Sequence, residues 1–73
     1  MSRELVLDVR GMSPPEPIER VLDAIDDFVA GDRLKLIIDC HPVPLFRILE
    51  SNGFAFQEMP GAESVYEIAI WLK

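Results

Sequence analysis

Residues that act as nucleophiles or metal ligands are scarce in this sequence. It contains one cysteine, Cys40, and one histidine, His41. A single cysteine cannot form a disulfide within the chain, so the fold does not require an oxidising compartment. A metal site within one chain would need carboxylates, such as those of Asp8 and Asp39, beside these two side chains. No paired-cysteine or paired-histidine spacing supports such a site, and we predict neither a metal nor a cofactor.

Long apolar runs and runs of basic residues are also lacking. The apolar stretches fall far short of the ~20 residues that span a bilayer. The segment that begins at Arg3 and Glu4 lacks the basic-then-apolar layout of a signal peptide. Thirteen acids against seven dispersed bases give a net charge of −6, which repels phosphate backbones and anionic membranes. We therefore expect a cytoplasmic protein that binds neither nucleic acid nor membrane.

Apolar residues do recur at regular intervals along the 73 residues, and they make up 49% of the chain. Period-two alternation predicts four strands, over residues 4–9, 33–39, 54–59 and 64–72, with a Pro60–Gly61 turn between the last two. Helical spacing predicts a first helix that ends near Ala30, and a second that starts beside Leu45 and ends at Asn52 and Gly53. The order is βαβαββ, within a single domain that covers residues 1–73.

The start of the first helix is rich in proline, and two registers fit it. With Ser13 as the N-cap, Glu16 falls at the spacing of a capping box. With Pro14 as the N-cap, Pro15 takes the first helical position and Pro17 the third, where no helical hydrogen bond is lost. We prefer the second register.

The order of elements predicts an α+β fold, a two-layer α/β sandwich. Right-handed βαβ connections place both helices on the same face of the sheet. The first three strands are then parallel, and the fourth is antiparallel beside the third. One face of the sheet is covered by helices and the other is open.

Two motifs resemble those of a known group of proteins. Residues 7–17, LDVRGMSPPEP, are similar to the signature of TusA/SirA-like sulfur carriers, in which a glycine follows a strand and a Cys-Pro-x-Pro element opens a helix. This motif and PVPLF, residues 42–46, together resemble the sister group named domain-of-unknown-function family 2249. The resemblance runs from Leu5 to about Leu72. It implies an initiation-factor-three-like sandwich with sheet order 1-2-4-3, and it implies no settled activity.

Pro14 stands where the carriers have their reactive cysteine. Persulfide relay needs a thiolate, and a helix N-terminus favours one because the helix dipole lowers the thiol pKa. Proline offers no nucleophile, so this position cannot carry sulfur. What remains is a rigid start of the helix.

The candidate binding site lies where the first two strands end, because ligands usually bind at the carboxyl edge of an open α/β sheet. Two proline-stiffened helix starts meet there, and helix N-termini attract anions. The candidate ligand-binding residues are Arg10, Gly11, Pro14, Pro15, Glu16, Pro17, Asp39, Cys40, His41, Pro42 and Pro44.

We expect a non-catalytic module that binds a protein partner or a small anionic ligand at this edge, and the residues favour this over an enzyme. The alternative is a redox or sulfur-handling protein that acts through Cys40, with His41 tuning the thiol or assisting through a metal. A lone cysteine is more often unreactive than catalytic. The acidic residues predicted on the outside of the first helix form a solvated surface, which can also dock a basic partner.

The open face of the sheet is a second candidate interface. Val6, Ile37 and Trp71 are predicted to lie there among charged residues, and an exposed tryptophan frequently anchors an interface. Alternatively, Trp71 packs flat on neighbouring strands. We expect a monomer or a weak homodimer.

Overall fold

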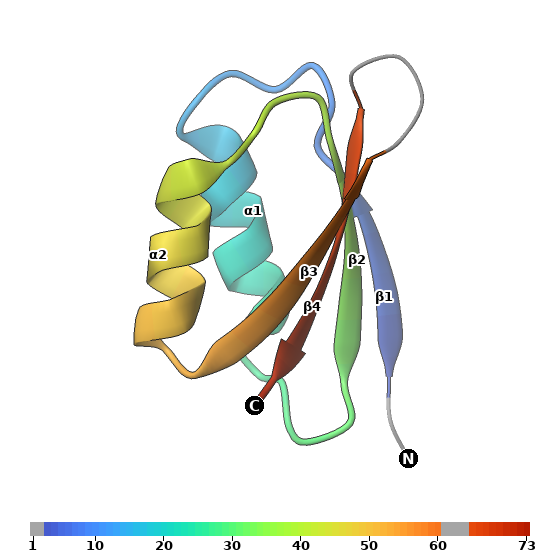
Figure 1. Ribbon diagram of the computed structural model, residues 1–73, viewed down its shortest axis with the longest axis vertical. Coiled ribbons are helices and arrows are strands. Elements are labelled where there is room, and N and C mark those ends of the chain that lie inside the picture. The colour runs from blue at the N-terminus through green and yellow to red at the C-terminus, as the bar shows by residue number, and fades with distance from the viewer. Residues whose placement is uncertain (1–2, 61–64) are drawn as a thin grey trace.

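The computed structural model describes residues 3–60 and 65–73. Within them the chain forms six elements in the predicted order βαβαββ (Figure 1). These are β1 (Glu4–Asp8), α1 (Glu16–Ile25), β2 (Arg33–Ile38), α2 (Val43–Ser51), β3 (Phe54–Pro60) and β4 (Tyr66–Leu72). Gly61 and Ser64, predicted to belong to the last turn and strand, lie outside the described residues. No helix in the described part of the chain is long and apolar enough to cross a membrane.

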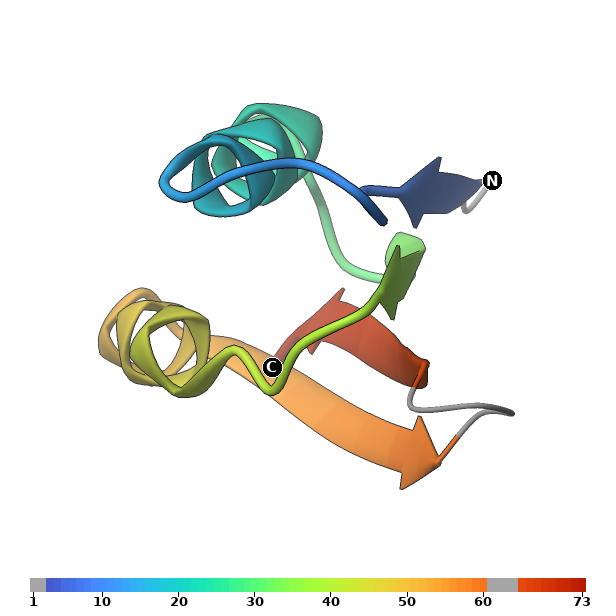
Figure 2. The same cartoon turned by 90° about the horizontal axis from the view of Figure 1, so that it is seen from above.

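The four strands form one mixed sheet in the order β1-β2-β4-β3. β1 pairs with β2 in parallel, and β4 lies antiparallel between β2 and β3. Both helices lie on the same side of the sheet, as Figure 2 shows from above. The predicted two-layer fold and the sheet order 1-2-4-3 are therefore confirmed.

The core lies between the sheet and the helices. α1 packs on β2 and α2 packs on β3, each through residues spaced one turn apart, so one stripe of each helix is buried. Alternate residues of β2 and β4 meet these stripes, because successive strand residues point to opposite faces. The buried side chains include Leu34, Leu36, Ile38, Ile68 and Ile70 from the sheet, and Val21, Ile25, Leu45 and Leu49 from the helices.

The first helix begins one residue later than predicted. Pro15 is its N-cap, Glu16 its first residue and Pro17 its second, and Ser13 makes no side-chain cap hydrogen bond. Instead the carbonyl oxygen of Ser13 accepts the N–H of Glu16 at 3.0 Å. Pro17 loses no helical hydrogen bond at this position, and its side chain is buried.

The first helix also ends earlier than predicted, at Ile25 instead of near Ala30. The N–H of Phe28 donates to the carbonyl oxygen of Ile25 at 3.1 Å, which tightens the last turn. Phe28 is thereby turned into the core beside the ring of Phe54, while Val29 is 61% exposed. The helical pattern in the sequence therefore continues past the point where the helix stops.

A buried carboxylate, that of Asp32, holds the start of β1. Its side chain is 1% exposed and accepts the backbone N–H of Arg3 at 2.9 Å and that of Val29 at 3.1 Å. The guanidinium of Arg3 binds Asp32 at 2.9 Å and Asp27 at 3.2 Å. These hydrogen bonds, the backbone N–H of Arg3 first, lower the pKa of Asp32 to about 2.

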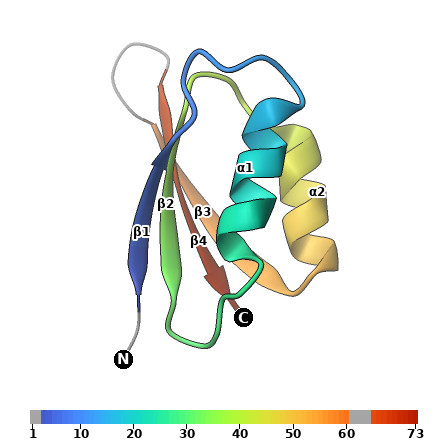
Figure 3. The ribbon, with the colours of Figure 1, turned by 180° about the vertical axis from the view of Figure 1, so that it is seen from behind.

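The two ends of the described chain lie at the same end of the sheet. Glu4 pairs with Arg33, which pairs with Trp71, so the beginning of β1 and the end of β4 share one row. The loops that follow β1 and β2 lie at the opposite end, as seen from the other side in Figure 3.

Replacing Asp32 with asparagine should destabilise the fold at neutral pH, because the carboxylate is buried and its hydrogen bonds depend on its charge. A carboxyl with a folded pKa of about 2 and an unfolded pKa of ~3.9 stabilises the folded state above the unfolded value. That contribution is lost as the pH falls from about 4 through about 2. We expect a urea midpoint clearly below that of the parent chain at neutral pH, and a difference that shrinks on acidification.

Asp27→Asn is the matched control, because Asp27 shares the Arg3 guanidinium but its side chain is 71% exposed. It should lower the urea midpoint much less, since exposed ion pairs contribute little. Equal losses from the two variants would show that burial of Asp32 is not the cause.

Candidate functional site

The loops that follow β1 and β2 lie side by side at the carboxyl edge of the sheet. The N–H of Gly11 donates to Oδ2 of Asp39 at 2.9 Å, and Gly11 has a φ of 81°, which favours glycine there. Beneath them, the N–H of Val9 donates to the carbonyl oxygen of Ile37 at 2.9 Å. The two predicted segments, residues 10–17 and 39–44, therefore meet at one edge.

Arg10 is already paired within this edge. Its guanidinium contacts Oδ2 of Asp8 at 2.6 Å, and its Nε contacts Oδ1 at 2.9 Å. Hydrogen bonds with Asp8 raise the pKa of Arg10 and lower that of Asp8, and the charge of Asp39 adds to the rise. The positive charge expected to attract an anionic ligand is thus neutralised by the neighbouring carboxylate.

The start of α1 offers few free hydrogen-bond donors. The N–H groups of Glu16 and Glu19 donate to carbonyl oxygens of the preceding loop at 3.0 and 3.2 Å, and Pro17 has no N–H. Among the hydrogen bonds of the described residues, only the N–H of Ile18 in this first turn lacks an acceptor.

The start of α2 repeats this arrangement. The N–H of Val43 donates to the carbonyl oxygen of His41 at 3.0 Å, and that of Phe46 to the carbonyl oxygen of Pro42 at 3.2 Å. Pro44 has no N–H, which leaves Leu45 as the one donor of the turn without an acceptor in the described part of the chain. Anion binding at a helix start uses several such donors, so neither start is well suited to it.

Cys40 and His41 have different surroundings. Cys40 is exposed with a free thiol. His41 has its Nε2 at 3.0 Å from Oε1 of Glu58, and its ring packs edge-on against Phe46 and at a tilt against Tyr66, with centroids 5.5 and 5.6 Å away. The described contacts of His41 are therefore with α2, β3 and β4.

Glu58 and Tyr66 were not identified from the sequence as partners of His41. Glu58 pairs with Ile68 on the side of the sheet that faces the helices, and the alternation of β3 places it in line with Phe54 and Phe56. A charged residue at an apolar position of a strand is the signal that would have indicated it. Among the residues that the structure describes, no group of three or more histidine, cysteine, aspartate and glutamate side chains is placed to hold a metal ion.

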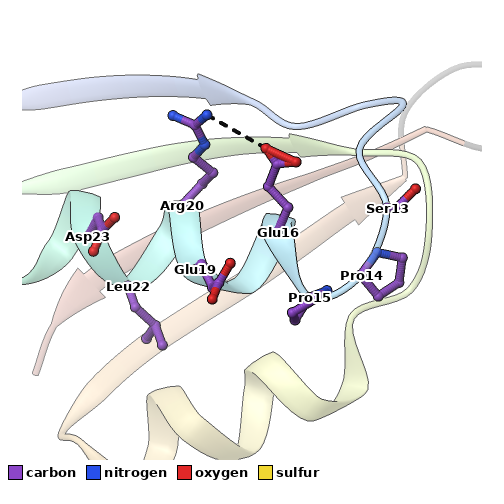
Figure 4. Close-up of a pocket in the computed structure, with 8 residues that line it drawn as sticks. All are labelled: Ser13, Pro14, Pro15, Glu16, Glu19, Arg20, Leu22 and Asp23. Atoms are coloured by element: carbon purple, nitrogen blue, oxygen red, sulfur yellow. Dashed lines mark ion pairs between the residues drawn. The ribbon is translucent and has the colours of Figure 1, made fainter.

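A groove of about 770 Å³ runs along the outer side of α1 from the proline-rich loop (Figure 4). Three of its lining residues are acidic and one is basic, and the basic one, Arg20, lies 3.6 Å from Glu16. Leu22 points from the groove toward the side on which α2 lies. The groove is lined by Ser13, Pro14, Pro15, Glu16, Glu19, Arg20, Leu22 and Asp23.

The groove includes residues 13–16 of the first predicted segment, but not Arg10, Gly11 or Pro17, and none of the second segment. The sequence predicts a site at the loops and a solvated surface along the outer side of α1. The structure joins the loop and the outer side of α1 in one concave, acidic surface. Helical spacing from Pro15 through Glu19 to Asp23, four residues at a time, is the signal for this continuity.

Small anions should bind weakly at this edge, because Asp8 neutralises Arg10 and each helix start has one donor to offer. We expect millimolar phosphate or thiosulfate to cause no saturable shift of the Ile18 and Leu45 amide resonances in ¹⁵N–¹H spectra. The amide of Trp71, at the far end of the sheet, serves as the internal control. A saturable shift at Ile18 or Leu45, with none at Trp71, would contradict this and support a small anionic ligand.

A known protein structure has the same fold as this chain. A SirA-like protein from Desulfitobacterium hafniense has a similar solved structure, with a TM-score of 0.80 and 22% sequence identity over 90% of this chain and 93% of that chain. No curated protein shows a significant match. Residues 6–72 match the model of a family described as uncharacterized conserved protein (DUF2249). Since that match covers nearly the whole sequence, the chain belongs to the DUF2249 family.

Proposed function

We propose that this chain is a non-catalytic docking module that binds a protein partner with a basic surface. The binding surface combines the edge formed by residues 10–17 and 39–44 with the acidic groove beside α1. The observation that carries the proposal is the groove itself, a concave surface of about 770 Å³ in which carboxylates outnumber bases. The proposal also places the chain in the cytoplasm, where an exposed thiol such as that of Cys40 stays reduced.

The charge of the groove favours a basic partner. The carboxylates of Glu19 and Asp23 are exposed and make no salt bridge within the described residues. They are thus available for lysine or arginine side chains of another protein. Complementary charge of this kind speeds association and excludes partners of the wrong sign.

The rigidity of the edge also favours a docking role. Gly11 and Asp39 tie the two loops together, and Pro17 and Pro42 are buried and fix the helix starts. A surface that is ordered before binding loses less conformational entropy when a partner binds. Pro14 and Pro15 are exposed and add an apolar contact at the mouth of the groove.

Site-specific photo-crosslinking tests the proposal in cells that produce the chain. A photoreactive amino acid at position 19 lies in the groove, and one at position 50 replaces another exposed acid, Glu50, on α2 outside the groove. We expect a discrete protein adduct from position 19 and none from position 50. The crosslinked peptide of the partner should be rich in lysine and arginine.

Charge reversal then tests the contact with the purified partner. Asp23→Lys replaces attraction by repulsion in the groove, and we expect its Kd to rise by about tenfold or more. Glu50→Lys changes the net charge equally but outside the groove, and its Kd should change much less. Equal adducts from both positions, or equal effects of both reversals, would overturn the proposal.

A redox or sulfur-handling role through Cys40 is the second candidate, and the exposure of its thiol at the edge favours it. In such a role the Cys40 thiolate attacks the outer sulfur of a persulfide donor. The S–S bond of the donor breaks, a persulfide forms on Cys40, and the donor leaves as a thiol. Reactivity then depends on activation by the folded surroundings. His41, the neighbour best suited to this, is engaged with Glu58.

On the docking proposal, Cys40 should react no faster in the folded chain than in the unfolded one. Mass spectrometry would follow the gain of one sulfur atom on incubation with a small persulfide donor, with and without urea. We expect rates that agree within about threefold, because none of the hydrogen bonds and salt bridges of the described residues involves the thiol. A folded chain that reacts far faster, and passes the sulfur on to an added thiol, would favour the sulfur-handling role instead.

A further inference from the structure

The side of the sheet away from the helices carries twelve residues in three rows across the four strands. Successive strand residues alternate between the two sides, and the strand register aligns these residues across the sheet. We call this surface the open face. Its rows are Glu4, Arg33, Trp71 and Ala55; Val6, Lys35, Ala69 and Gln57; and Asp8, Ile37, Glu67 and Met59.

The open face carries large apolar side chains that the chain itself covers only in part. Val6 is 65% exposed and Met59 44% exposed, and Ile37 and Trp71 are partly exposed on the same face. The guanidinium of Arg33 lies over the Trp71 ring at 5.0 Å and covers part of it. Exposed apolar residues gathered on one face indicate an interaction surface more than singly scattered ones do.

The net charge of the molecule is distributed unevenly between its two sides. The open face has three acids (Glu4, Asp8 and Glu67) and two bases (Arg33 and Lys35), and so contributes −1 to the net charge of −6. Residues 16–27, which contain α1, contribute −4. Two copies of the chain would repel each other strongly through their helices and only weakly through their open faces.

We propose that the open face docks a second copy of this chain, so that two sheets pack face to face in a dimer with the helices outside. A two-fold interface requires a patch that complements itself. The open face has both signs of charge, with Lys35 and Glu67 3.0 Å apart, and apolar residues around them. Sheets packed in this way lie ~10 Å apart.

The size of the open face makes the dimer weak. Strands ~4.8 Å apart and ~6.7 Å between alternate residues give a face of roughly 19 by 20 Å. This footprint is about half of the ~800 Å² per partner that a standard interface buries. Burying the Lys35–Glu67 pair adds a desolvation cost. Association is therefore expected only at high protein concentration.

Sedimentation velocity from about 10 µM to about 1 mM tests the proposal, a range chosen because small interfaces associate weakly. We expect the average mass to rise toward that of a dimer. Trp71 is the only tryptophan, so its fluorescence reports on the open face alone, and its emission should shift to the blue over the same range as it loses contact with water.

Two valines provide matched variants. Val6→Lys places a charge in the open face and should weaken dimerisation by about tenfold or more, since an unpaired charge must then be buried. Val29→Lys changes a valine of similar exposure, 61% against 65%, outside the open face, and should leave the dimer unchanged. If Val6→Lys fails to fold, Met59→Lys, on the same face, takes its place.

A chain that stays monomeric up to the highest concentration would overturn the proposal and leave the open face to a different protein. A dimer that Val29→Lys weakens as much as Val6→Lys would overturn it too, because the contact would then lie elsewhere. These outcomes are independent of the docking proposal, whose groove lies beside α1 on the other side of the sheet.

Discussion

The carboxylate of Asp32 connects three parts of the chain: the residue before β1, the segment after α1, and the residue before β2, which is Asp32 itself. It accepts N–H groups from the start of β1 and from the segment after α1, and it binds the Arg3 guanidinium, which also contacts Asp27. This fixes where α1 stops and holds β1 in register at the edge of the sheet. In a domain this small, where the apolar core is limited, one satisfied buried charge has a large effect on the choice of a single fold.

The two helices cover only one side of the sheet, and this asymmetry organises the surface. The covered side presents helices, a strongly acidic groove and two proline-stiffened loops. The open face presents apolar side chains with nearly balanced charges. The two contacts that we propose, one with a basic protein and one with a second copy of the chain, therefore use different sides of the sheet and would not obstruct each other.

The order of elements and the sheet topology could be predicted because each element has a regular apolar period and right-handed crossovers leave few arrangements. The meeting of the two loops could be predicted too, since the carboxyl ends of parallel strands coincide. The end of α1 could not, because the N–H of Val29 donates to Asp32 and not to a helical carbonyl. The pairing of His41 with Glu58 depends on how α2 approaches β3, and no local pattern encodes that approach. The groove likewise depends on how the proline-rich loop runs into α1.

The shared position of the two ends of the described chain bears on how such a domain can be combined with others. Glu4 and Trp71 lie in one row, at the end of the sheet opposite the paired loops. A linker attached at either end, or at both, would leave the molecule away from the loop edge and the start of the groove. The fold is therefore suited to fusion at either end without blocking the loop edge.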